Sequence, residues 1–384
     1  MGEGQRPLEN MERLIDMQET FGSIFKGKKV LVTGHSGFKG SWLSTWLIEL
    51  GAEVVGYSLY EPSKPSNFRV LNLRDRLNDI KGDICDYKHL KKLFDDFSPE
   101  VVFHLAAQAI TCLSYDIPHD TFYTNVGGTI NIFECIRESK SVKAAVIITS
   151  DKCYLNSEWT WGYRESDRLG GKDPYSASKA CAELVSYSYN KSFFSGNKSP
   201  GISTARAGNV IGGGDWARDR VIPDCVKALN SGKKLIIRNP QATRPWQHVL
   251  EPLSGYLWLG ACLLKNKKNV RGESFNFGPA DKVTQSVKEL IGEFLKIWGK
   301  GTWKHIPVKN QKSESASLKL CCDKALHELS WHSLLTFQEA VALAAEWYKN
   351  YYYNKNNMYD FTCSQIKYYI KKAITQNMPW VNKV

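Results

Sequence analysis

A short apolar strand that leads directly into a glycine-rich turn constrains the fold of this chain more than any other feature. Residues 28–33 read K-K-V-L-V-T, and Gly34, Gly37 and Gly40 follow at the spacing G-x-x-G-x-x-G. A helical pattern then runs to a stop at Gly51, and a second strand, E-V-V-G-Y-S-L-Y, follows at once. This strand–helix–strand order predicts a dinucleotide site, because a pyrophosphate can rest on backbone N–H groups at a helix N-terminus.

The same letters allow two other interpretations of the turn. A tight structural turn also needs glycines, but the strand before it and the helix after it are the context that the dinucleotide motif demands. A nucleophile elbow, G-x-S-x-G, would make Ser36 the nucleophile of a hydrolase, yet Phe38 stands where its last glycine should be. We therefore favour the dinucleotide site and expect Phe38 to be one of its contacts.

The end of the second strand indicates which nicotinamide cofactor binds. Glu61 lies about twenty residues past the glycines, where an acid accepts hydrogen bonds from the ribose hydroxyls of NAD. No Arg adjoins Tyr60 and Glu61 in the sequence to receive the 2′-phosphate of NADP. The sequence therefore favours NAD.

Strands and helices continue to alternate through the first half of the chain. A third strand ends at Asp83 and Ile84, an acid and an apolar residue that can lie on either side of an adenine. A fourth strand covers 101–108 and a fifth covers 144–149. This alternation predicts an α/β fold with a doubly wound parallel (Rossmann) sheet, which binds ligands at the carboxyl ends of its strands. The further cofactor contacts expected there are Asp83, Ile84, Ala106, Ala107, Gln108 and Asn125.

The fifth strand is followed by residues suited to proton transfer. It ends in Ser150, Asp151 and Lys152, and D-P-Y-S-A-S-K follows later, with Tyr175 and Lys179 four residues apart. On a helix these two side chains share one face. The ammonium is then expected to lower the phenol pKa from about 10 towards neutrality, so that Tyr175 can act as a base.

Beyond residue 205 the sequence becomes irregular and rich in Arg, Asn, Trp and His. Arg238 and Arg244 lie in such a segment, and guanidinium groups bind phosphate oxygens in pairs. We interpret the segment as the site of a phosphorylated ligand. The alternative is a set of surface salt bridges from these arginines to Asp215, Asp219 and Glu251.

The length of 384 residues and this change of character predict two domains. A cofactor domain is expected to comprise 28–205 and about 244–275. A smaller mixed α/β substrate domain would comprise 206–243 and 276–350.

The two ends of the chain are expected to add little to the core. Residues 1–27 read as a poorly ordered extension and residues 351–384 as a loosely packed tail.

Composition excludes several classes of protein. The net charge of +12 comes from short Lys clusters, which indicate a solvated basic surface, and no array resembles a nucleic-acid module. Ten cysteines without a C-x-x-C pair predict a reducing compartment and no metal site. The start of the chain is polar, and the longest apolar run, Gly255–Leu264, is too short to span a bilayer. We expect a cytoplasmic protein without nucleic-acid or membrane partners.

The glycine pattern together with Tyr-x-x-x-Lys resembles the extended short-chain dehydrogenase/reductase family. More narrowly, five strings are similar to its CDP-glucose 4,6-dehydratase branch: T-G-H-S-G-F-K-G-S-W-L, T-S-D-K-C-Y, W-G-Y-R-E, R-A-G-N-V-I-G-G-G-D-W and R-P-W-Q-H-V-L-E-P-L-S-G-Y. The likeness extends over about 21–348, and the last two strings are specific to that branch.

The resemblance implies that CDP-glucose is oxidised at carbon 4 with NAD, loses water across carbons 5 and 6, and regains the hydride at carbon 6. Tyr175 would take the proton of the 4-hydroxyl, Lys179 would hold the nicotinamide ribose, and Ser150 would bind the 4-oxygen. Asp151 would protonate the leaving 6-hydroxyl, and Lys152 would remove the proton from carbon 5. The substrate contacts implied are Asn209, Arg220, Arg238, Arg244 and His248.

Other functions stay open at this point. They are a UDP- or dTDP-linked sugar 4,6-dehydratase, a 4-epimerase, and a non-catalytic sensor that binds dinucleotide. Inverting UDP-sugar dehydratases also carry an Asp–Lys pair, so Asp151 and Lys152 do not separate them, whereas R-P-W-Q-H-V-L-E-P favours the CDP branch. A surface ion pair is the non-catalytic alternative for the same two residues. Relatives form dimers or tetramers, and a homodimer or homotetramer is expected here.

Overall fold

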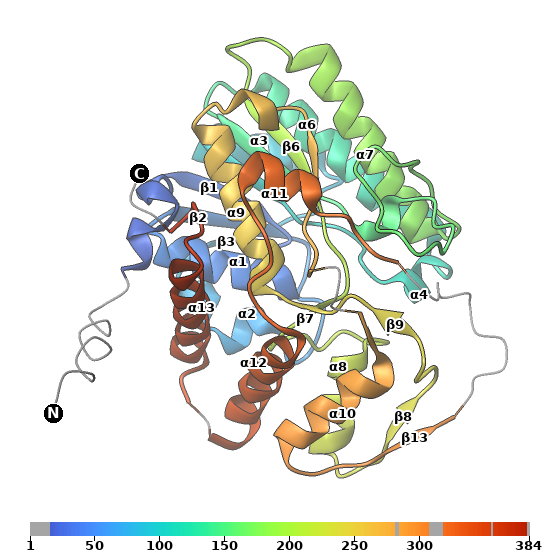
Figure 1. Cartoon of the computed structure of the whole chain (residues 1–384). Coiled ribbons are helices and arrows are strands. Elements are labelled where there is room, and N and C mark those ends of the chain that lie inside the picture. The colour runs from blue at the N-terminus through green and yellow to red at the C-terminus, as the bar shows by residue number, and fades with distance from the viewer. Residues whose placement is uncertain (1–15, 281–283, 307–317, 355, 382–384) are drawn as a thin grey trace, which may run out of the picture.

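A parallel sheet forms the centre of the molecule, as the computed structural model of the chain shows (Figure 1). The structure describes residues 16–280, 284–306, 318–354 and 356–381. Seven strands are hydrogen-bonded in the order β11-β6-β5-β4-β1-β2-β3. Their bounds are β1 (Lys29–Thr33), β2 (Glu53–Ser58), β3 (Asn78–Lys81), β4 (Val101–His104), β5 (Ala144–Ile148), β6 (Gly201–Arg206) and β11 (Ser274–Asn276). The direction of winding reverses at β1, which confirms the predicted doubly wound sheet.

Helices cover both faces of the sheet, because neighbouring residues of each strand point to opposite sides. Val30 and Val32 of β1 pack into one hydrophobic cluster, whereas Leu31 packs into another. The first is closed by α1 (Phe38–Glu49) and α9 (Leu250–Leu264), and the second by α3 (Tyr87–Phe97), α6 (Gly128–Glu138) and α7 (Pro174–Phe193). Burial on both faces explains why the strands read as continuous apolar runs.

Two glycines let the turn after β1 approach the end of β4. Gly34 has a positive φ of 73°, and a Cβ there would lie 2.8 Å from the backbone nitrogen of Ala106. A Cβ at Gly40 would lie 2.1 Å from the carbonyl oxygen of Gly34. Only glycine fits at both positions. Helix α1 begins at Phe38, immediately after this turn, as the motif predicts.

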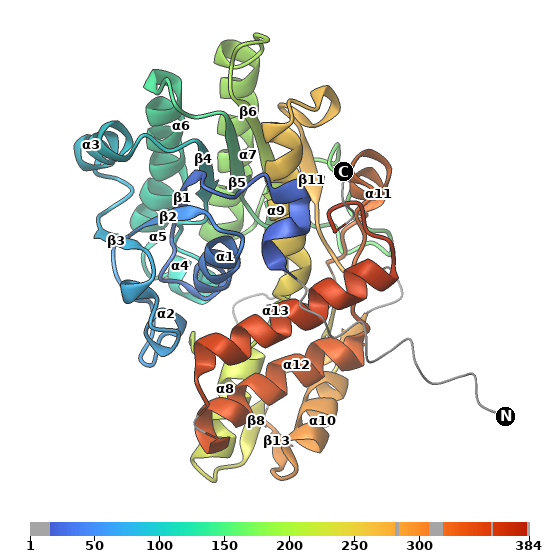
Figure 2. The ribbon, with the colours of Figure 1, turned by 90° about the vertical axis from the view of Figure 1, so that its left-hand side faces the viewer.

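A smaller part of the chain lies beside the carboxyl ends of the strands, below the sheet in Figure 1, and Figure 2 shows it from the side. Its helices are α8 (Val221–Asn230), α10 (Val287–Trp298) and α12 (Phe337–Lys349). Its short strand pairs are β7 (Val210–Ile211) with β10 (Gln247–His248), β8 (Leu235–Ile237) with β13 (Trp303–His305), and β9 (Thr243–Arg244) with β12 (Gln285–Ser286). The chain enters this part after β6 and again after β11. The domain boundaries inferred from the sequence stay a prediction.

Both ends of the described chain are packed, so the prediction of a loose extension and tail is wrong for them. Phe21 is completely buried, and its ring stacks on Trp380 with a centroid distance of 5.0 Å. Helix α13 (Met358–Thr375) buries Ile366 and Tyr369 and lies against α1 (Figure 2). The segment is polar overall, but its apolar residues recur at helical spacing and form one face of α13. That face packs against residues that are distant in sequence. Residues 1–15 and 382–384 of the two predicted segments lie outside the described residues.

Three further observations concern membranes, thiols and metals. Within the ranges that the structure describes, no helix combines the length and the apolar character needed to cross a membrane. All ten cysteines are described, and none of them forms a disulfide. No group of three His, Cys, Asp or Glu side chains among the described residues is placed to hold a metal ion.

Candidate active site

A cavity of about 380 Å³ lies where the carboxyl ends of β5 and β6 face the smaller part of the molecule. Its wall contains Ser150, Asp151, Lys152 and Tyr175, which are four of the five predicted catalytic residues. Six residues with amide or guanidinium groups also line it: Asn209, Arg218, Arg220, Arg238, Asn239 and Arg244. The fold therefore brings four of the five predicted catalytic residues and most of the predicted substrate contacts to one cavity, and Lys179 is not part of its wall.

Local capping places the catalytic side chains on both sides of this cavity. Ser150 caps a short 3₁₀ turn, where its Oγ accepts a hydrogen bond from the backbone N–H of Lys152 at 3.2 Å. Asp173 caps α7 by accepting from the N–H of Ser176 at 2.9 Å, and a proline occupies the first helical position. An Asp–Pro pair of this kind specifies a helix start, and so Tyr175 falls in the first turn of α7.

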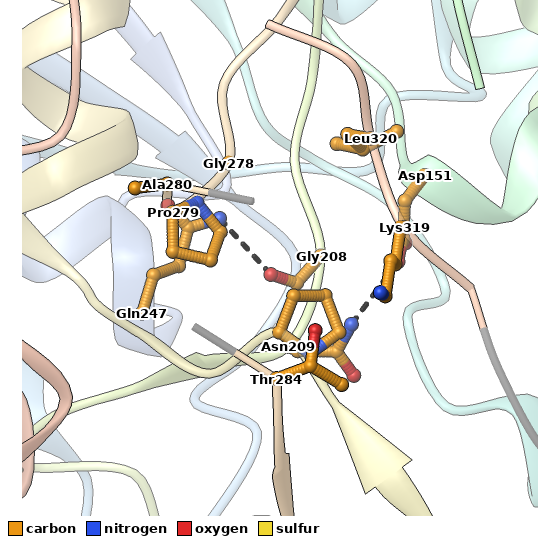
Figure 3. A pocket seen from close by; sticks show the side chains of 11 residues that line it. Asp151, Gly208, Asn209, Gln247, Gly278, Pro279, Ala280, Thr284, Lys319 and Leu320 are labelled. Atoms are coloured by element: carbon orange, nitrogen blue, oxygen red, sulfur yellow. Dashed lines mark hydrogen bonds between the residues drawn. The ribbon is translucent and has the colours of Figure 1, made fainter. Parts of the chain in front are cut away.

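The carboxylate of Asp151 is held between two neighbours. Ser150 Oγ donates to Asp151 Oδ1 at 3.0 Å, and Asn209 Nδ2 donates to Asp151 Oδ2 at 3.3 Å. Gly208 lies directly beneath, and a Cβ there would be 1.9 Å from Asp151 Oδ2. Figure 3 shows Asp151, Gly208 and Asn209 around a small hollow next to the cavity. Asp151 can take this position only because residue 208 has no side chain.

The predicted effect of Lys179 on Tyr175 is wrong for the protein chain alone. Burial raises the pKa of Tyr175 to about 12, a hydrogen bond from Ser150 opposes this, and the nearby charge of Asp151 adds to it. Burial also lowers the pKa of Lys179 to about 8, and the charge of Glu183 opposes that change. The Lys179 ammonium donates to the backbone oxygen of Ile148 at 3.3 Å. The four-residue spacing predicts the shared helix face but not the desolvation of both groups.

Two cavity residues escaped the sequence analysis. Lys152 Nζ donates to Thr111 Oγ1 at 3.0 Å, so a loop after β4 positions the predicted base. Lys39, from the glycine turn itself, also lines the cavity. Burial, and next the charge of Arg220, lower the pKa of Lys39 to about 8. A lysine between Phe38 and the last glycine of the motif was the signal that could have identified it.

The predicted cofactor residues gather around the carboxyl ends of β1 to β4. Gly34, Gly37, Phe38 and Gly40 form the turn after β1, and Ala106, Ala107 and Gln108 follow β4, which ends earlier than predicted, at His104. Asp83 and Ile84 follow β3, which ends at Lys81.

Asn125 lies inside a continuous helical stretch, in the turn Tyr123–Gly127 that runs directly into α6. Its amide donates to the Gln108 carbonyl at 3.0 Å and to Ser178 Oγ at 2.8 Å, and its Oδ1 accepts from the Gln108 N–H at 2.8 Å. Asn125 thus ties the loop after β4 to α7. The sequence cannot show this contact, because the three residues come from separate elements.

The environment of Glu61 differs from the prediction. An arginine that is not adjacent in sequence reaches it: Arg69 Nε donates to Glu61 Oε2 at 2.7 Å. Ser66 Oγ donates to the same oxygen at 2.5 Å. The helical turn α2 (Asn67–Val70) brings Arg69 back towards the end of β2, where Glu61 follows. The sequence analysis looked for an arginine adjacent to Glu61 and therefore did not identify Arg69 as the partner of its carboxylate.

The predicted substrate contacts fall into two groups. Arg238 pairs with Asp219 at 2.7 Å, which is one of the alternative salt bridges, and Arg220, which that alternative did not include, pairs with Asp215 at 2.9 Å. Both arginines also line the cavity. His248, in contrast, is fully buried, and Trp42 packs edge-on against it at 5.8 Å. It is not part of the cavity wall, and burial lowers its pKa to about 3. The structure thus does not bring His248 to the site.

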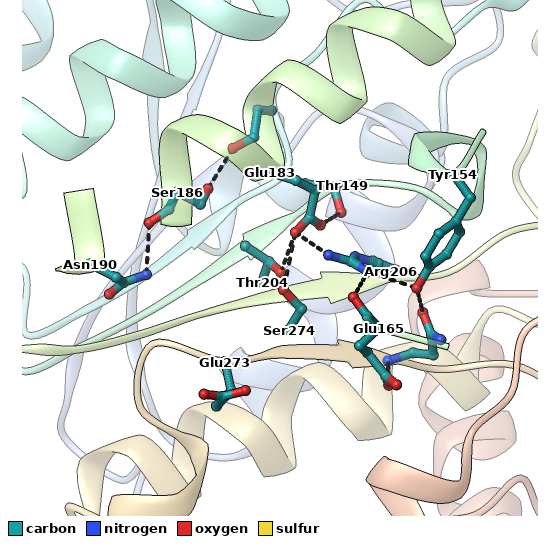
Figure 4. A network of polar contacts seen from close by, with 12 residues as sticks. Thr149, Tyr154, Glu165, Glu183, Ser186, Asn190, Thr204, Arg206, Glu273 and Ser274 are labelled. Atoms are coloured by element: carbon teal, nitrogen blue, oxygen red, sulfur yellow. Dashed lines mark hydrogen bonds and ion pairs between the residues drawn. The ribbon is translucent and has the colours of Figure 1, made fainter. Parts of the chain in front are cut away.

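A buried polar network fixes the two catalytic segments relative to each other (Figure 4). Glu183, one helical turn after Lys179, accepts hydrogen bonds from Thr149, from Thr204 Oγ1 at 2.9 Å and from Ser274 Oγ at 3.2 Å. Arg206 pairs with it at 2.7 Å, and both side chains are at most 3% exposed. Thr149 immediately precedes Ser150. The network therefore connects α7 with the carboxyl ends of β5 and β6 and with the first residue of β11.

Comparisons with known proteins agree with this geometry. The family model described as GDP-mannose 4,6 dehydratase matches residues 31–344. A protein of Salmonella typhimurium named CDP-glucose 4,6-dehydratase is 45% identical over 331 residues, which are 85% of this chain and 92% of that protein. The human protein named dTDP-D-glucose 4,6-dehydratase is 26% identical over 86% of this chain and 93% of its own length.

Solved structures show the same fold. The dTDP-glucose 4,6-dehydratase DesIV of Streptomyces venezuelae, crystallised with NAD, aligns with a TM-score of 0.72 at 23% identity over 85% of this chain and 99% of that one. The epimerase Mth375 of Methanothermobacter thermautotrophicus aligns with a TM-score of 0.75 at 24% identity over 88% and 96%. With the family model matched across most of its length, the chain belongs to the GDP-mannose 4,6 dehydratase family.

Proposed function

We propose that this protein is an NAD-dependent CDP-glucose 4,6-dehydratase, a hydro-lyase that forms CDP-4-keto-6-deoxyglucose. The observation that carries the proposal is the presence of Asp151 and Lys152 beside Ser150 and Tyr175 in one cavity. Hydride transfer at carbon 4 needs only the Ser, Tyr and Lys of a dehydrogenase. Elimination of water needs one more acid and one more base, which this pair supplies. The CDP branch follows from the 45% identity to the Salmonella protein of that name.

The residues would act in the following order. Tyr175 takes the proton of the 4-hydroxyl, and Ser150 binds the 4-oxygen. The new ketone acidifies the proton on carbon 5, and Lys152, oriented by Thr111 at 3.0 Å, removes it. Asp151 protonates the 6-hydroxyl as it leaves.

The cofactor residues fit a dinucleotide. Gly37 caps α1 without a side-chain hydrogen bond, and a Cβ at Gly34 would fill the space towards Ala106. Gly34, Gly37, Phe38 and Gly40 would hold the pyrophosphate, with Asp83, Ile84, Ala106 and Ala107 towards the adenosine half and Lys179 at the nicotinamide ribose. NAD, when bound, takes up the hydride from carbon 4 and returns it to carbon 6. Glu61 would bind the adenosine ribose.

The nucleotide sugar would lie with its diphosphate towards the arginines. Arg220, Arg238 and Arg244 line the same cavity as the catalytic residues, together with Asn209. Its volume of about 380 Å³ lies within the range of small-molecule sites.

We also propose a homodimer and a cytoplasmic location. Leu184 and Tyr187 on the outer face of α7 are 56% and 62% exposed, and Phe122 and Tyr123 of the neighbouring helical stretch are exposed as well. An apolar face of this kind favours pairing with a second copy. Light scattering should give twice the chain mass for the wild type and one chain mass for Leu184→Glu. Ten cysteines with no disulfide among them favour a reducing compartment.

The test of the function is product formation from CDP-, dTDP- and UDP-glucose by the purified protein with NAD. We expect a 4-keto product, read by its absorbance in alkali, from CDP-glucose above all. A 4-epimerised sugar without a ketone would identify an epimerase. No product from any of the three nucleotide sugars would favour the non-catalytic sensor that binds dinucleotide. Lys152→Ala should keep bound NAD and form no 4-keto-6-deoxy sugar, and normal turnover by it would remove Lys152 from the mechanism.

A further inference from the structure

The cavity also extends to α8 and β8, which lie side by side in the smaller part of the molecule (Figure 1 and Figure 2). The apolar residues of these two elements that line it are Val221, Ile222, Pro223, Leu235, Ile236 and Ile237. Apolar walls of this kind suit the faces of a flat heterocycle better than a sugar or a phosphate. With the sugar beside the catalytic residues and the diphosphate beside the arginines, the base of the nucleotide falls at this end of the cavity.

A carboxylate at this end is available to a ligand. Among the described residues, four carboxylates line the cavity: Asp151, Asp215, Asp219 and Asp224. The first serves the chemistry, and the next two pair with Arg220 at 2.9 Å and with Arg238 at 2.7 Å. Asp224 Oδ1 lies 3.9 Å from Lys227 Nζ, which is too long for a hydrogen bond. Of these four side chains, Asp224 is therefore the one whose oxygens can accept a hydrogen bond from the base.

A carboxylate distinguishes cytosine from uracil by hydrogen bonding alone. At ring position 4 cytosine carries an amino group, which donates, and uracil carries an oxygen, which accepts. An ionised carboxylate only accepts, so it binds the amino group and repels the oxygen. Backbone groups cannot make this choice. Strand β8 pairs with β13 in a sheet of two strands, and a free strand edge offers both N–H and C=O groups.

We propose that Asp224 accepts a hydrogen bond from the amino group of cytosine and thereby selects CDP-linked over UDP-linked sugars. This role rests on the proposed function and names the residue that sets its nucleotide specificity. Burial raises the pKa of Asp224, and the charge of Lys227 opposes this change. An amino group that donates to the carboxylate replaces part of the lost hydration without adding a further charge.

Asp224 has a second effect, which the test must separate from the first. It lies in the first turn of α8, where a negative charge stabilises the helix. This contribution is the same whichever nucleotide is bound. Loss of it lowers the melting temperature but does not change the preference between two nucleotides.

The experiment measures the dissociation constants of CDP and UDP by calorimetry on the NAD-loaded protein. Wild type should bind CDP roughly tenfold to a hundredfold more tightly than UDP, the range for one well-placed base contact. Asp224→Asn should lose this preference, because an amide can turn its oxygen towards cytosine or its NH₂ towards uracil. Asp219→Asn is the matched control: it removes one negative charge from the same wall and should keep the wild-type ratio of the two constants.

A wild-type ratio near one, or an unchanged ratio in Asp224→Asn, would overturn the proposal. Loss of the preference in both variants would also overturn it, because charge alone would then explain the effect. If Asp224→Asn does not fold, wild type decides with the CDP analogue in which hydrogen replaces the amino group of the base. Weak binding of this analogue, as for UDP, supports the contact, and binding as tight as that of CDP refutes it.

The activity of wild type separates this proposal from the proposed function. If wild type prefers CDP and Asp224→Asn does not, yet wild type forms no 4-keto product from CDP-glucose, the dehydratase function is refuted and the cytosine contact stands. Product from CDP-glucose together with equal binding of CDP and UDP refutes the contact alone.

Discussion

Replacing Gly208 by alanine tests whether the position of one carboxyl group decides the second half of the reaction. The added Cβ would lie 1.9 Å from Asp151 Oδ2 and 2.0 Å from its Cγ, closer than side chains ever approach. The backbone at Gly208 cannot easily retreat, because its carbonyl accepts a hydrogen bond from Gln247 Nε2 at 3.0 Å. Asp151 must therefore move and lose its contacts with Asn209 and Ser150.

The size of the effect follows from this displacement. To restore ordinary contact the carboxylate must move by more than about 1 Å, and a shift of that size lowers catalysis about 10²-fold. Loss of the general acid altogether slows a reaction by roughly 10²–10⁴-fold. We expect elimination to fall within this range. The strain of overpacking should lower the free energy of unfolding by about 1–3 kcal/mol, which leaves the protein folded.

The assay is stopped-flow absorbance of the reduced cofactor after mixing with CDP-glucose, with 4-keto product measured in parallel. Oxidation at carbon 4 uses Tyr175 rather than Asp151, so Gly208→Ala should accumulate NADH where wild type shows little. Gly292→Ala is the matched control, because a Cβ at that position in α10 meets nothing within 4 Å. A turnover rate of Gly208→Ala within about threefold of wild type, or equal loss of both steps, would refute the reasoning.

Three further predictions concern other buried or charged groups. Glu183→Gln leaves the Arg206 charge buried without its carboxylate partner and should lower the free energy of unfolding by about 3–5 kcal/mol in urea titrations. Glu183→Leu/Arg206→Met should recover part of this loss, and an unchanged free energy of unfolding in the single variant would contradict the prediction. Burial raises the pKa of Glu251 from 4.5 to about 7, so between these pH values the folded state holds a proton that the unfolded state releases. Protonated Glu251 therefore stabilises the folded state fully below about pH 4.5, and this contribution is lost as the pH rises through about 7. The melting temperature of Glu251→Gln should therefore fall less than that of wild type between about pH 5 and about pH 8. If the melting temperatures of the two proteins change in parallel over this range, the raised pKa of Glu251 is refuted. Arg220→Met should raise the KM for CDP-glucose roughly tenfold to a hundredfold with a smaller change in kcat, and an unchanged KM would remove Arg220 from the substrate site.

Much of the fold could be predicted from the sequence because its signals are local. Gly34 has a positive φ, and a Cβ at Gly40 would meet the carbonyl oxygen of Gly34, so both positions need glycine for reasons that act within a few residues. The residues after the turn also show the pattern of the following helix. The start of α7 is set by Asp173 and the proline after it, which fixes Tyr175 in the first turn. Such features depend on neighbours in sequence, and pattern reasoning captures them.

The rest depends on contacts between distant segments. The pKa of Tyr175 is set by burial beneath loops that come from elsewhere in the chain, so its direction could not be read from the spacing to Lys179. His248 belongs to a string typical of the enzyme branch, yet it packs under Trp42 of α1 rather than in the cavity. Arg69 reaches Glu61 only because α2 turns back towards β2.

The stacking of Phe21 on Trp380 has a consequence for synthesis of the protein. Trp46 of α1 lies edge-on to both rings, at 5.9 Å and 6.1 Å, so a single aromatic cluster combines the earliest and latest described segments. A nascent chain on the ribosome cannot close this cluster until translation has passed Trp380 and the exit tunnel has released it. Until then the outer side of α1 stays uncovered, and chaperones are needed most at that stage.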